Sequence, residues 1–225
     1  MRISIASALF LAAASFGHAS ITINFGLGGV YTAGGGSQIA AGTIGVLVAD
    51  TTGAGFAQGA DLVGSTLSVG SSLGTNGRIL GVLSATNNLF GSGIAGFDAA
   101  INITDPLLSG LTFGTATNNA GSDLMFYWFP GITSAGSTIT EGQSYGSFRE
   151  DSLAALAGSA SDMSFNLPAN SDLLGLYANT INTGGDLPND TFQANSTAGV
   201  AGVPEPSRMI LALLGFAGLM FRRRR

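Results

Sequence analysis

The chain of 225 residues contains no cysteine and no lysine, and His18 is its only histidine. The absence of cysteine excludes disulfide bonds, so an exported form of this chain has no covalent cross-links to stabilise it. Stability must then come from an apolar core, and 45% of the residues are hydrophobic. A body of about 180 residues is long enough to bury such a core.

Positive charge is almost missing from the body of the chain. Between Ser20 and Val203 the only cations are Arg78 and Arg149, against twelve acidic residues, which leaves a net charge of −10. Such an acidic surface repels phosphate backbones and anionic lipids. We therefore expect no nucleic-acid partner, whereas divalent cations or plain solubility outside the cell are compatible with this charge.

The first 19 residues have the three parts of a secretory signal peptide. Met1-Arg2 is a short basic start, Ile3–Phe16 is apolar, and Gly17-His18-Ala19 places small residues at the two positions that signal peptidase reads. We expect cleavage after Ala19. Since His18 is then removed, the mature chain has no histidine.

The last 23 residues, 203–225, combine three features in a fixed order. The first is a polar motif with two prolines, made of Val203, Pro204, Glu205, Pro206 and Ser207. After Arg208 come an uncharged apolar run, Met209–Phe221, and a basic end formed by Arg222, Arg223, Arg224 and Arg225. Each proline favours extended backbone in the residue before it, so the motif is predicted to be an accessible extended segment.

The apolar run predicts a C-terminal transmembrane helix. Its thirteen residues reach about 20 Å at about 1.5 Å per residue, which is short of the roughly 30 Å of a bilayer core. Snorkelling of Arg208 and local thinning of the bilayer close part of that gap. The four terminal arginines hold this end on the cytoplasmic side.

This three-part tail resembles the PEP-CTERM sorting signal of Gram-negative bacteria, on Pro204-Glu205-Pro206, Met209–Phe221 and Arg222–Arg225. The resemblance covers only residues 203–225. It implies recognition by exosortase, a multi-pass membrane cysteine protease that cuts near the motif, and members of the family tend to occur in organisms that make extracellular polysaccharide. Arg208 departs from the family, which more often has a small or hydroxylated residue there. The alternative interpretation is an ordinary tail anchor with prolines in its linker.

Residues 20–180 are predicted to form an acidic, glycine-rich, all-β domain, an antiparallel β-sandwich or barrel-like fold. Many of the 35 glycines lie beside Ser, Thr, Asn and Asp, a composition typical of turns. Short apolar or alternating runs between these turns predict strands at Ile21–Phe25, Thr43–Ala49, Leu62–Val69, Arg78–Ala85, Ile94–Ile103, Leu107–Phe113, Asp123–Phe129, Ser144–Arg149, Met163–Leu167 and Leu173–Tyr177.

One short helix is expected over Glu150–Ala160, with a cap at Asp151-Ser152 and an end near Gly158. Residues 181–202 are poor in apolar periodicity and rich in Asn, Thr and Gly. They predict a flexible linker to the membrane with at most one late strand.

Catalytic chemistry has few candidates in this chain. Ser72 and Ser144 each fit G-x-S-x-G, but neither histidine nor lysine is left to activate them. Only carboxylates remain as general acids or bases, and Glu141, Glu150 and Asp151 lie close in sequence. Glu150 and Asp151 are explained more simply as the favourable negative charge of a first helical turn.

A metal site is not expected. Asp186 and Asp190 with Asn189 carry oxygen ligands that suit calcium, but without the regular spacing of a known calcium loop. We interpret that stretch as a solvated loop. The prediction is therefore a non-enzymatic protein without cofactor or metal.

The densest aromatic cluster is Phe126-Tyr127-Trp128-Phe129. On a strand, Phe126 and Trp128 face one side and Tyr127 and Phe129 the other. Packing in the core is the favoured interpretation. The alternative is an exposed sugar-stacking surface, with Tyr127 and Trp128 as the glycan contacts.

Together these features predict an exported protein. Signal peptidase and exosortase process it, and a membrane-tethered precursor in the inner membrane precedes a form at the cell surface or outside the cell. The favoured function is a non-catalytic surface or extracellular-matrix component. The alternatives are a carbohydrate-binding module of the exopolysaccharide matrix and, third, a hydrolase that uses carboxylates alone.

Overall fold

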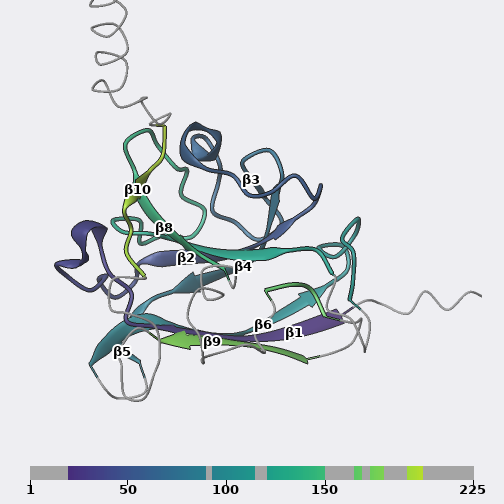
Figure 1. Ribbon diagram of the computed structural model, residues 1–225, viewed down its shortest axis with the longest axis horizontal. Coiled ribbons are helices and arrows are strands. Elements are labelled where there is room, and N and C mark those ends of the chain that lie inside the picture. Colours follow the sequence, from purple (N-terminus) through teal and green to yellow (C-terminus); the bar gives the residue numbers. More distant parts are fainter. Residues whose placement is uncertain are drawn as a thin grey trace, which may run out of the picture.

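The structure is a computed structural model that describes residues 20–89, 93–114, 121–149, 165–168, 173–179 and 192–199. These residues form a β-sandwich-like body of two facing sheets (Figure 1). The expected signal peptide, the short helix over Glu150–Ala160, the carboxylates Asp186 and Asp190, and residues 203–225 all lie outside the described ranges. Within those ranges no helix is long and apolar enough to cross a membrane.

The smaller sheet has four strands in the order β5-β6-β1-β9, whose bounds are Thr86–Leu89, Ile94–Thr104, Ser20–Gly28 and Leu173–Asn179. β1 and β6 pair antiparallel over nine residues, from Ser20 opposite Thr104 to Gly28 opposite Gly96. β9 runs parallel to β1. The prediction of an antiparallel fold is therefore wrong for this pair, because alternation of side chains has the same period in both kinds of sheet.

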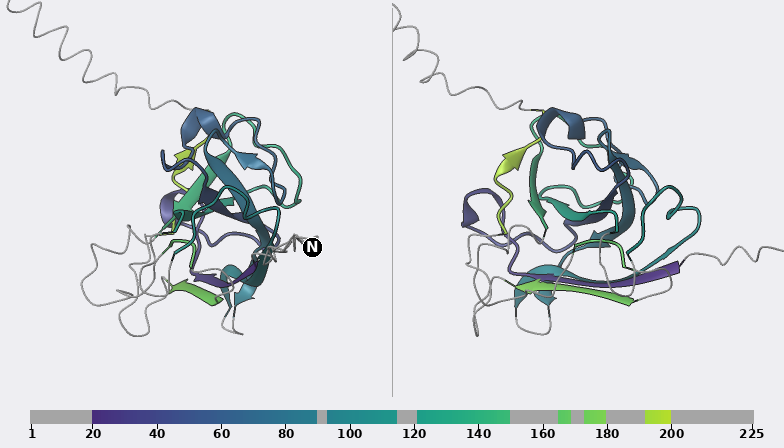
Figure 2. Two further views of the ribbon diagram at one scale, coloured as in Figure 1. Left: turned by 90° about the vertical axis from the view of Figure 1, so that its right-hand side faces the viewer. Right: turned by 45° about the vertical axis from the view of Figure 1, so that its right-hand side comes forward.

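The larger sheet has six strands in the order β10-β8-β7-β2-β4-β3, with bounds Ser196–Thr197, Ser144–Phe148, Leu124–Phe129, Ile44–Asp50, Gly77–Ser84 and Ser72–Leu73. Its strands pair antiparallel, as predicted. A register shift between Leu47 and Val48 marks an irregularity in the β2–β4 pair. Figure 2 shows this sheet curled into a half-barrel above the flatter four-stranded sheet.

The main core lies between the two sheets. β1 turns Ile21, Ile23, Phe25 and Leu27 toward the larger sheet, and all four are at most 1% exposed. From the larger sheet, Phe126 and Trp128 of β7 face β1. The ring centroids of Phe25 and Phe126 lie 4.3 Å apart. Close contact of large rings supplies much of the apolar burial that a chain without disulfides needs.

A second core covers the opposite face of the larger sheet. It contains Val46, Val48, Tyr127 and Phe129 from β2 and β7, packed against residues from the connecting loops such as Leu67. Every residue of β2 and β7 is therefore buried. This explains why these two strands are almost continuously apolar in sequence, while the four-stranded sheet alternates.

Seven of the predicted runs coincide with strands β1, β2, β4, β6, β7, β8 and β9. The strand predicted over Leu62–Val69 is wrong: Leu62 ends the 3-10 helix η2 (Gly59–Leu62), and Thr66 forms only an isolated bridge to Thr138. Leu107–Phe113 is also not a strand. Leu62 and Leu67 are apolar because they cover the second core from a loop.

Other short elements carry weak sequence signals. β3, β5 and β10 were not predicted individually, since they are brief and mostly polar. A second 3-10 helix, η1, spans Ala33–Gly35. Of the predicted run Met163–Leu167, residues 165–167 are described, and Asn166 forms an isolated bridge to Asp123.

The end of the predicted linker belongs to the body. Phe192, Ala194 and Ala198 are completely buried, and β10 pairs with β8. Residues 192–199 therefore belong to the body and not to a linker, and β10 is a late strand in the described part of that stretch.

Candidate functional site

The aromatic cluster on β7 lies inside the protein. Tyr127 and Trp128 are both 0% exposed. The Tyr127 hydroxyl donates to the Ala57 carbonyl at 2.9 Å, and Trp128 Nε1 donates to the Tyr31 carbonyl at 3.4 Å. Burial raises the pKa of the Tyr127 phenol, so it remains a neutral donor.

The prediction of Tyr127 and Trp128 as glycan contacts is wrong, because neither ring reaches the surface. The favoured interpretation is confirmed, including the division of sides: Phe126 and Trp128 belong to the core between the sheets, Tyr127 and Phe129 to the second core. A strand covered on both faces has no exposed side on which a sugar ring can stack.

A polar cavity of about 320 Å³ opens where β2 ends and β7 begins. It is lined by Asp50, Thr51, Thr52, Gly53, Gly110, Thr112, Gly121, Ser122 and Asp123. The backbone N–H of Asp50 donates to the carbonyl of Asp123 at 2.9 Å, which joins the two acidic positions across the sheet end. Neither residue is among the candidate site residues predicted from the sequence.

Asp50 is held by the loop that follows it. Its Oδ1 accepts from the backbone N–H groups of Thr52 (2.9 Å) and Gly53 (3.0 Å) and from the Thr52 hydroxyl (3.2 Å). Its Oδ2 accepts from the Gly55 N–H at 2.7 Å. Burial opposes ionisation of Asp50, but the donors from Thr52, Gly55 and Gly53 outweigh it, and the pKa is lowered.

Asp123 is the more accessible carboxylate of this cavity. Its Oδ1 accepts from Asn166 Nδ2 at 2.5 Å, and its Oδ2 lies 3.4 Å from the Arg149 guanidinium. The Asp123 side chain is 42% exposed, so solvent screens the ion pair. The Arg149 guanidinium also lies 5.6 Å from the centre of the Phe56 ring.

Asp50 does not have the environment of a general acid. A glycosidase pair needs one carboxyl that carries a proton near neutral pH. Asp50 has a lowered pKa instead, and all its hydrogen-bond donors come from its own loop. Its geometry is that of a carboxylate that stabilises a turn.

The earlier acid–base candidates do not meet at this cavity. Glu141 is exposed on the loop before β8 and does not line it. Glu150 and Asp151 lie outside the described residues. In the ranges that the structure describes, no three His, Asp or Glu side chains gather where they could hold a metal ion.

The two arginines of the body support structure. Arg149 forms the ion pair with Asp123. Arg78 on β4 donates through one guanidinium nitrogen to the carbonyls of Leu107 (3.0 Å) and Ser109. These bonds attach the segment after β6 to β4 of the larger sheet.

An exposed aromatic residue was missed by the sequence analysis. Tyr177 on β9 is 52% exposed and stands opposite Gly26 on β1. A Cβ built on Gly26 would lie 2.7 Å from Tyr177 Cδ1, and one on Gly175 would lie 3.3 Å from Cε2. The ring therefore rests against the sheet over two glycines. Its only sequence signal is an aromatic residue at the end of the predicted strand Leu173–Tyr177, two residues after Gly175.

The predicted processing residues lie outside the described residues. These are Ala19, the motif Val203, Pro204, Glu205, Pro206 and Ser207, and the basic end Arg222, Arg223, Arg224 and Arg225. The described chain begins with Ser20, which is already the first residue of β1. Comparison of the chain with protein-family models, with curated proteins and with solved structures finds no match in any of the three.

Proposed function

We propose that this protein is an exported, non-catalytic component of the cell surface or extracellular matrix, sorted and processed through its C-terminal tail by exosortase. The observation that carries the proposal is the order of the tail: Pro204-Glu205-Pro206, then Met209–Phe221, then Arg222–Arg225. Three independent features in this order are more specific than a proline motif or an apolar run alone. The signal peptide at residues 1–19 supplies the export that such a tail requires.

The position of the folded body supports the proposal. β1 begins at Ser20, directly after the expected cleavage at Ala19. Cleavage after Ala19 and near Pro204-Glu205-Pro206 would therefore leave the ten described strands, β1 to β10, intact.

The composition of the body also supports a location outside the cytoplasm. It has no thiol to oxidise, and its net charge between residues 20 and 203 is −10. Two apolar cores replace disulfides as the source of stability. A large net charge of one sign favours solubility.

The test compares intact masses and cell fractions of the mature protein from its own host with those of a variant carrying Pro204→Ala, Glu205→Ala and Pro206→Ala. We expect the wild type to lack both residues 1–19 and the arginine end. We expect the variant to keep its tail in the inner membrane. If the wild type instead retains Arg222–Arg225 in the inner membrane, the tail is an ordinary anchor and the proposal fails.

Tyr127 and Trp128 cannot be the sugar contacts of a carbohydrate-binding module, because both side chains are buried. The carbohydrate-binding alternative remains favoured by one other observation, the exposed ring of Tyr177. The hydrolase alternative has a separate test: loss of an activity on Glu141→Gln or Glu150→Gln, with the fold intact, would support it.

A further inference from the structure

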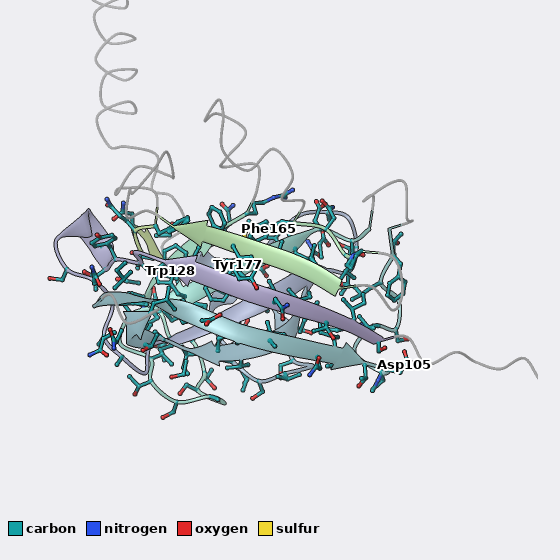
Figure 3. All side chains as sticks on the ribbon, turned by 90° about the horizontal axis from the view of Figure 1, so that it is seen from below. Asp105, Trp128, Phe165 and Tyr177 are labelled. Atoms are coloured by element: carbon teal, nitrogen blue, oxygen red, sulfur yellow. The ribbon has the colours of Figure 1, made fainter. Side chains whose placement is uncertain are left out.

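The outer face of the four-stranded sheet is polar and made of small side chains. On β6, Asp98, Ala100, Asn102 and Thr104 are exposed, while the opposite side of the strand carries the buried Phe97, Ile101 and Ile103 and the partly buried Ala99. On β1 the outward positions across from them are Gly26, Asn24, Thr22 and Ser20. Figure 3 looks onto this face, with Tyr177 labelled on β9.

The strand register arranges these residues in rows across the sheet. Tyr177 is opposite Gly26, and Gly26 is opposite Asp98. Because adjacent strands are about 4.8 Å apart, the Asp98 backbone lies about 10 Å from that of Tyr177, with only a glycine between them. The ring and the carboxylate thus stand on either side of a shallow, flat strip.

The next rows continue the strip with hydrogen-bonding groups. Asn24 lies between Ala100 and Gly175. In the following row the Thr22 hydroxyl donates to Asn102 Oδ1 at 2.9 Å, which holds the Asn102 amide in one orientation. From the row of Tyr177 to the row of Asn102 the face extends for about 14 Å at about 3.4 Å per residue.

The glycines beneath Tyr177 fix its ring in place. A side chain at Gly26 would collide with the ring, since its Cβ would lie 2.7 Å from Cδ1. The same packing of an aromatic ring over a glycine on the neighbouring strand occurs in the core, where Trp128 lies over Gly146. There the indole is fully buried, whereas Tyr177 presents a held ring to solvent at 52% exposure. A ring that is already ordered loses little conformational entropy when it binds a ligand.

Charge and composition decide what such a face can bind. Asp98 is the charged residue among the described outward positions of β6, β1 and β9, and the arginines Arg78 and Arg149 are engaged elsewhere. An acidic face on an acidic body repels uronate or sulfate polymers. Protein interfaces are centred on apolar clusters, whereas the described outward neighbours of Tyr177 on β1 and β9 are Gly26, Asn24 and Gly175.

We propose that the outer face of β6, β1 and β9 is a binding surface for a neutral polysaccharide. The C–H groups of one sugar ring lie on the negative π-face of Tyr177. The hydroxyls of the sugars along the strip bond to Asn24, Asn102 and the Asp98 carboxylate. This adds a ligand to the proposed surface or matrix role and does not depend on the tail.

The experiment is native affinity electrophoresis of the full chain in non-ionic detergent. The gels contain hydroxyethyl cellulose, dextran or galactomannan as neutral probes, or polygalacturonate as the anionic probe. We expect at least one neutral polymer to retard the wild type in proportion to its concentration, and polygalacturonate to leave it unretarded. Absence of retardation by all three neutral polymers, or stronger retardation by polygalacturonate, overturns the proposal.

Variants assign the binding to this face. Tyr177→Ile covers the glycines with an apolar side chain but removes the π-face, so we expect binding to weaken at least about tenfold. Tyr177→Phe keeps the ring and is expected to bind within about threefold of the wild type. Gly26→Ala keeps the tyrosine but displaces its ring, and it should weaken binding as well.

The matched control is Val69→Ala. Val69 is also 52% exposed, but it belongs to the loop before β3, beside the larger sheet. If Val69→Ala weakens retardation as much as Tyr177→Ile, the binding is non-specific and the proposal is wrong.

Trp128 fluorescence should stay unchanged when the polysaccharide binds, because the indole is buried. The intact mass of the Tyr177→Ile variant from the host shows whether its signal peptide and arginine end are removed. This measurement tests processing of the tail independently of polysaccharide binding.

Discussion

At the scale of single residues, Asp50 shows how a buried carboxylate is stabilised by backbone donors. It is 3% exposed, yet three N–H groups and one hydroxyl point at its two oxygens. Hydrogen bonds to a charged group are worth more than those to a neutral one. The loop after β2 is therefore organised by one side chain, and its conformation depends on the charge of that side chain.

We predict that Asp50→Asn lowers the free energy of unfolding by about 1 to 3 kcal/mol at pH 7, because the amide replaces one acceptor by a donor that faces an N–H group. The pKa of Asp50 is lowered in the folded state. Its contribution to stability is therefore complete above the unfolded pKa of about 4 and is lost as the pH falls through the folded value. The difference between wild type and variant should be smaller at pH 3 than at pH 7.

Urea denaturation at the two pH values measures this difference. Asp98→Asn is the control, since it removes the same charge from an exposed position on β6. It should change the free energy of unfolding by less than about 0.5 kcal/mol. An Asp50→Asn variant as stable as the wild type at pH 7 would show that the turn holds without the carboxylate.

At the scale of elements, glycine in a strand makes room for an aromatic ring on the neighbouring strand. Gly146 on β8 is opposite Trp128 on β7, and a Cβ at Gly146 would lie 2.0 Å from Trp128 Cζ2. Such a contact is far shorter than van der Waals distance, so the indole or the strand has to move. The glycine-rich composition of this chain thus serves strand packing as well as turns.

Gly146→Ala is expected to destabilise the protein by about 1 to 3 kcal/mol through overpacking. The emission of Trp128, the only tryptophan, reports any displacement of the indole together with the unfolding transition. Gly36→Ala is the matched control, because Gly36 has φ −75° and nothing within 4 Å of its built Cβ. A Gly146→Ala variant with wild-type stability and unchanged emission would contradict this account of the pair.

Several elements could be predicted from the sequence because their patterns are long. β7 shows two buried sides in Phe126–Phe129, and β6 alternates between buried and more exposed positions from Phe97 to Thr104. The direction of β9 could not be predicted, since the pattern of a strand does not reveal its partner. The outward position of Tyr177 depends on the pairing of β9 with β1, so the exposure of its side chain could not be predicted from the sequence either. Asp50 and Asp123 meet only because β2 and β7 are neighbours.

At the scale of the whole molecule, the last described segment closes the body. Phe192 is fully buried and packs edge-on against Phe148, with ring centroids 4.5 Å apart, and against Trp128 at 6.5 Å. Its carbonyl accepts from the Tyr31 N–H at 2.8 Å. Residues near the end of the body thus contact β7, β8 and the segment after β1. The core between the sheets is completed only after most of the chain is present.

We therefore predict that Phe192→Ala lowers the free energy of unfolding by about 3 to 5 kcal/mol, the usual cost of removing a buried phenylalanine side chain. Ser196→Ala, an exposed change in β10 of the same segment, should cost less than about 0.5 kcal/mol. Urea denaturation followed by Trp128 emission measures both, since the indole contacts Phe192. If residues 192–199 are instead a linker that packs weakly on the body, Phe192→Ala and Ser196→Ala will unfold together with the wild type. The stability would then reside in strands β1 to β9 alone, and a tail cut upstream of Phe192 would still release a folded protein.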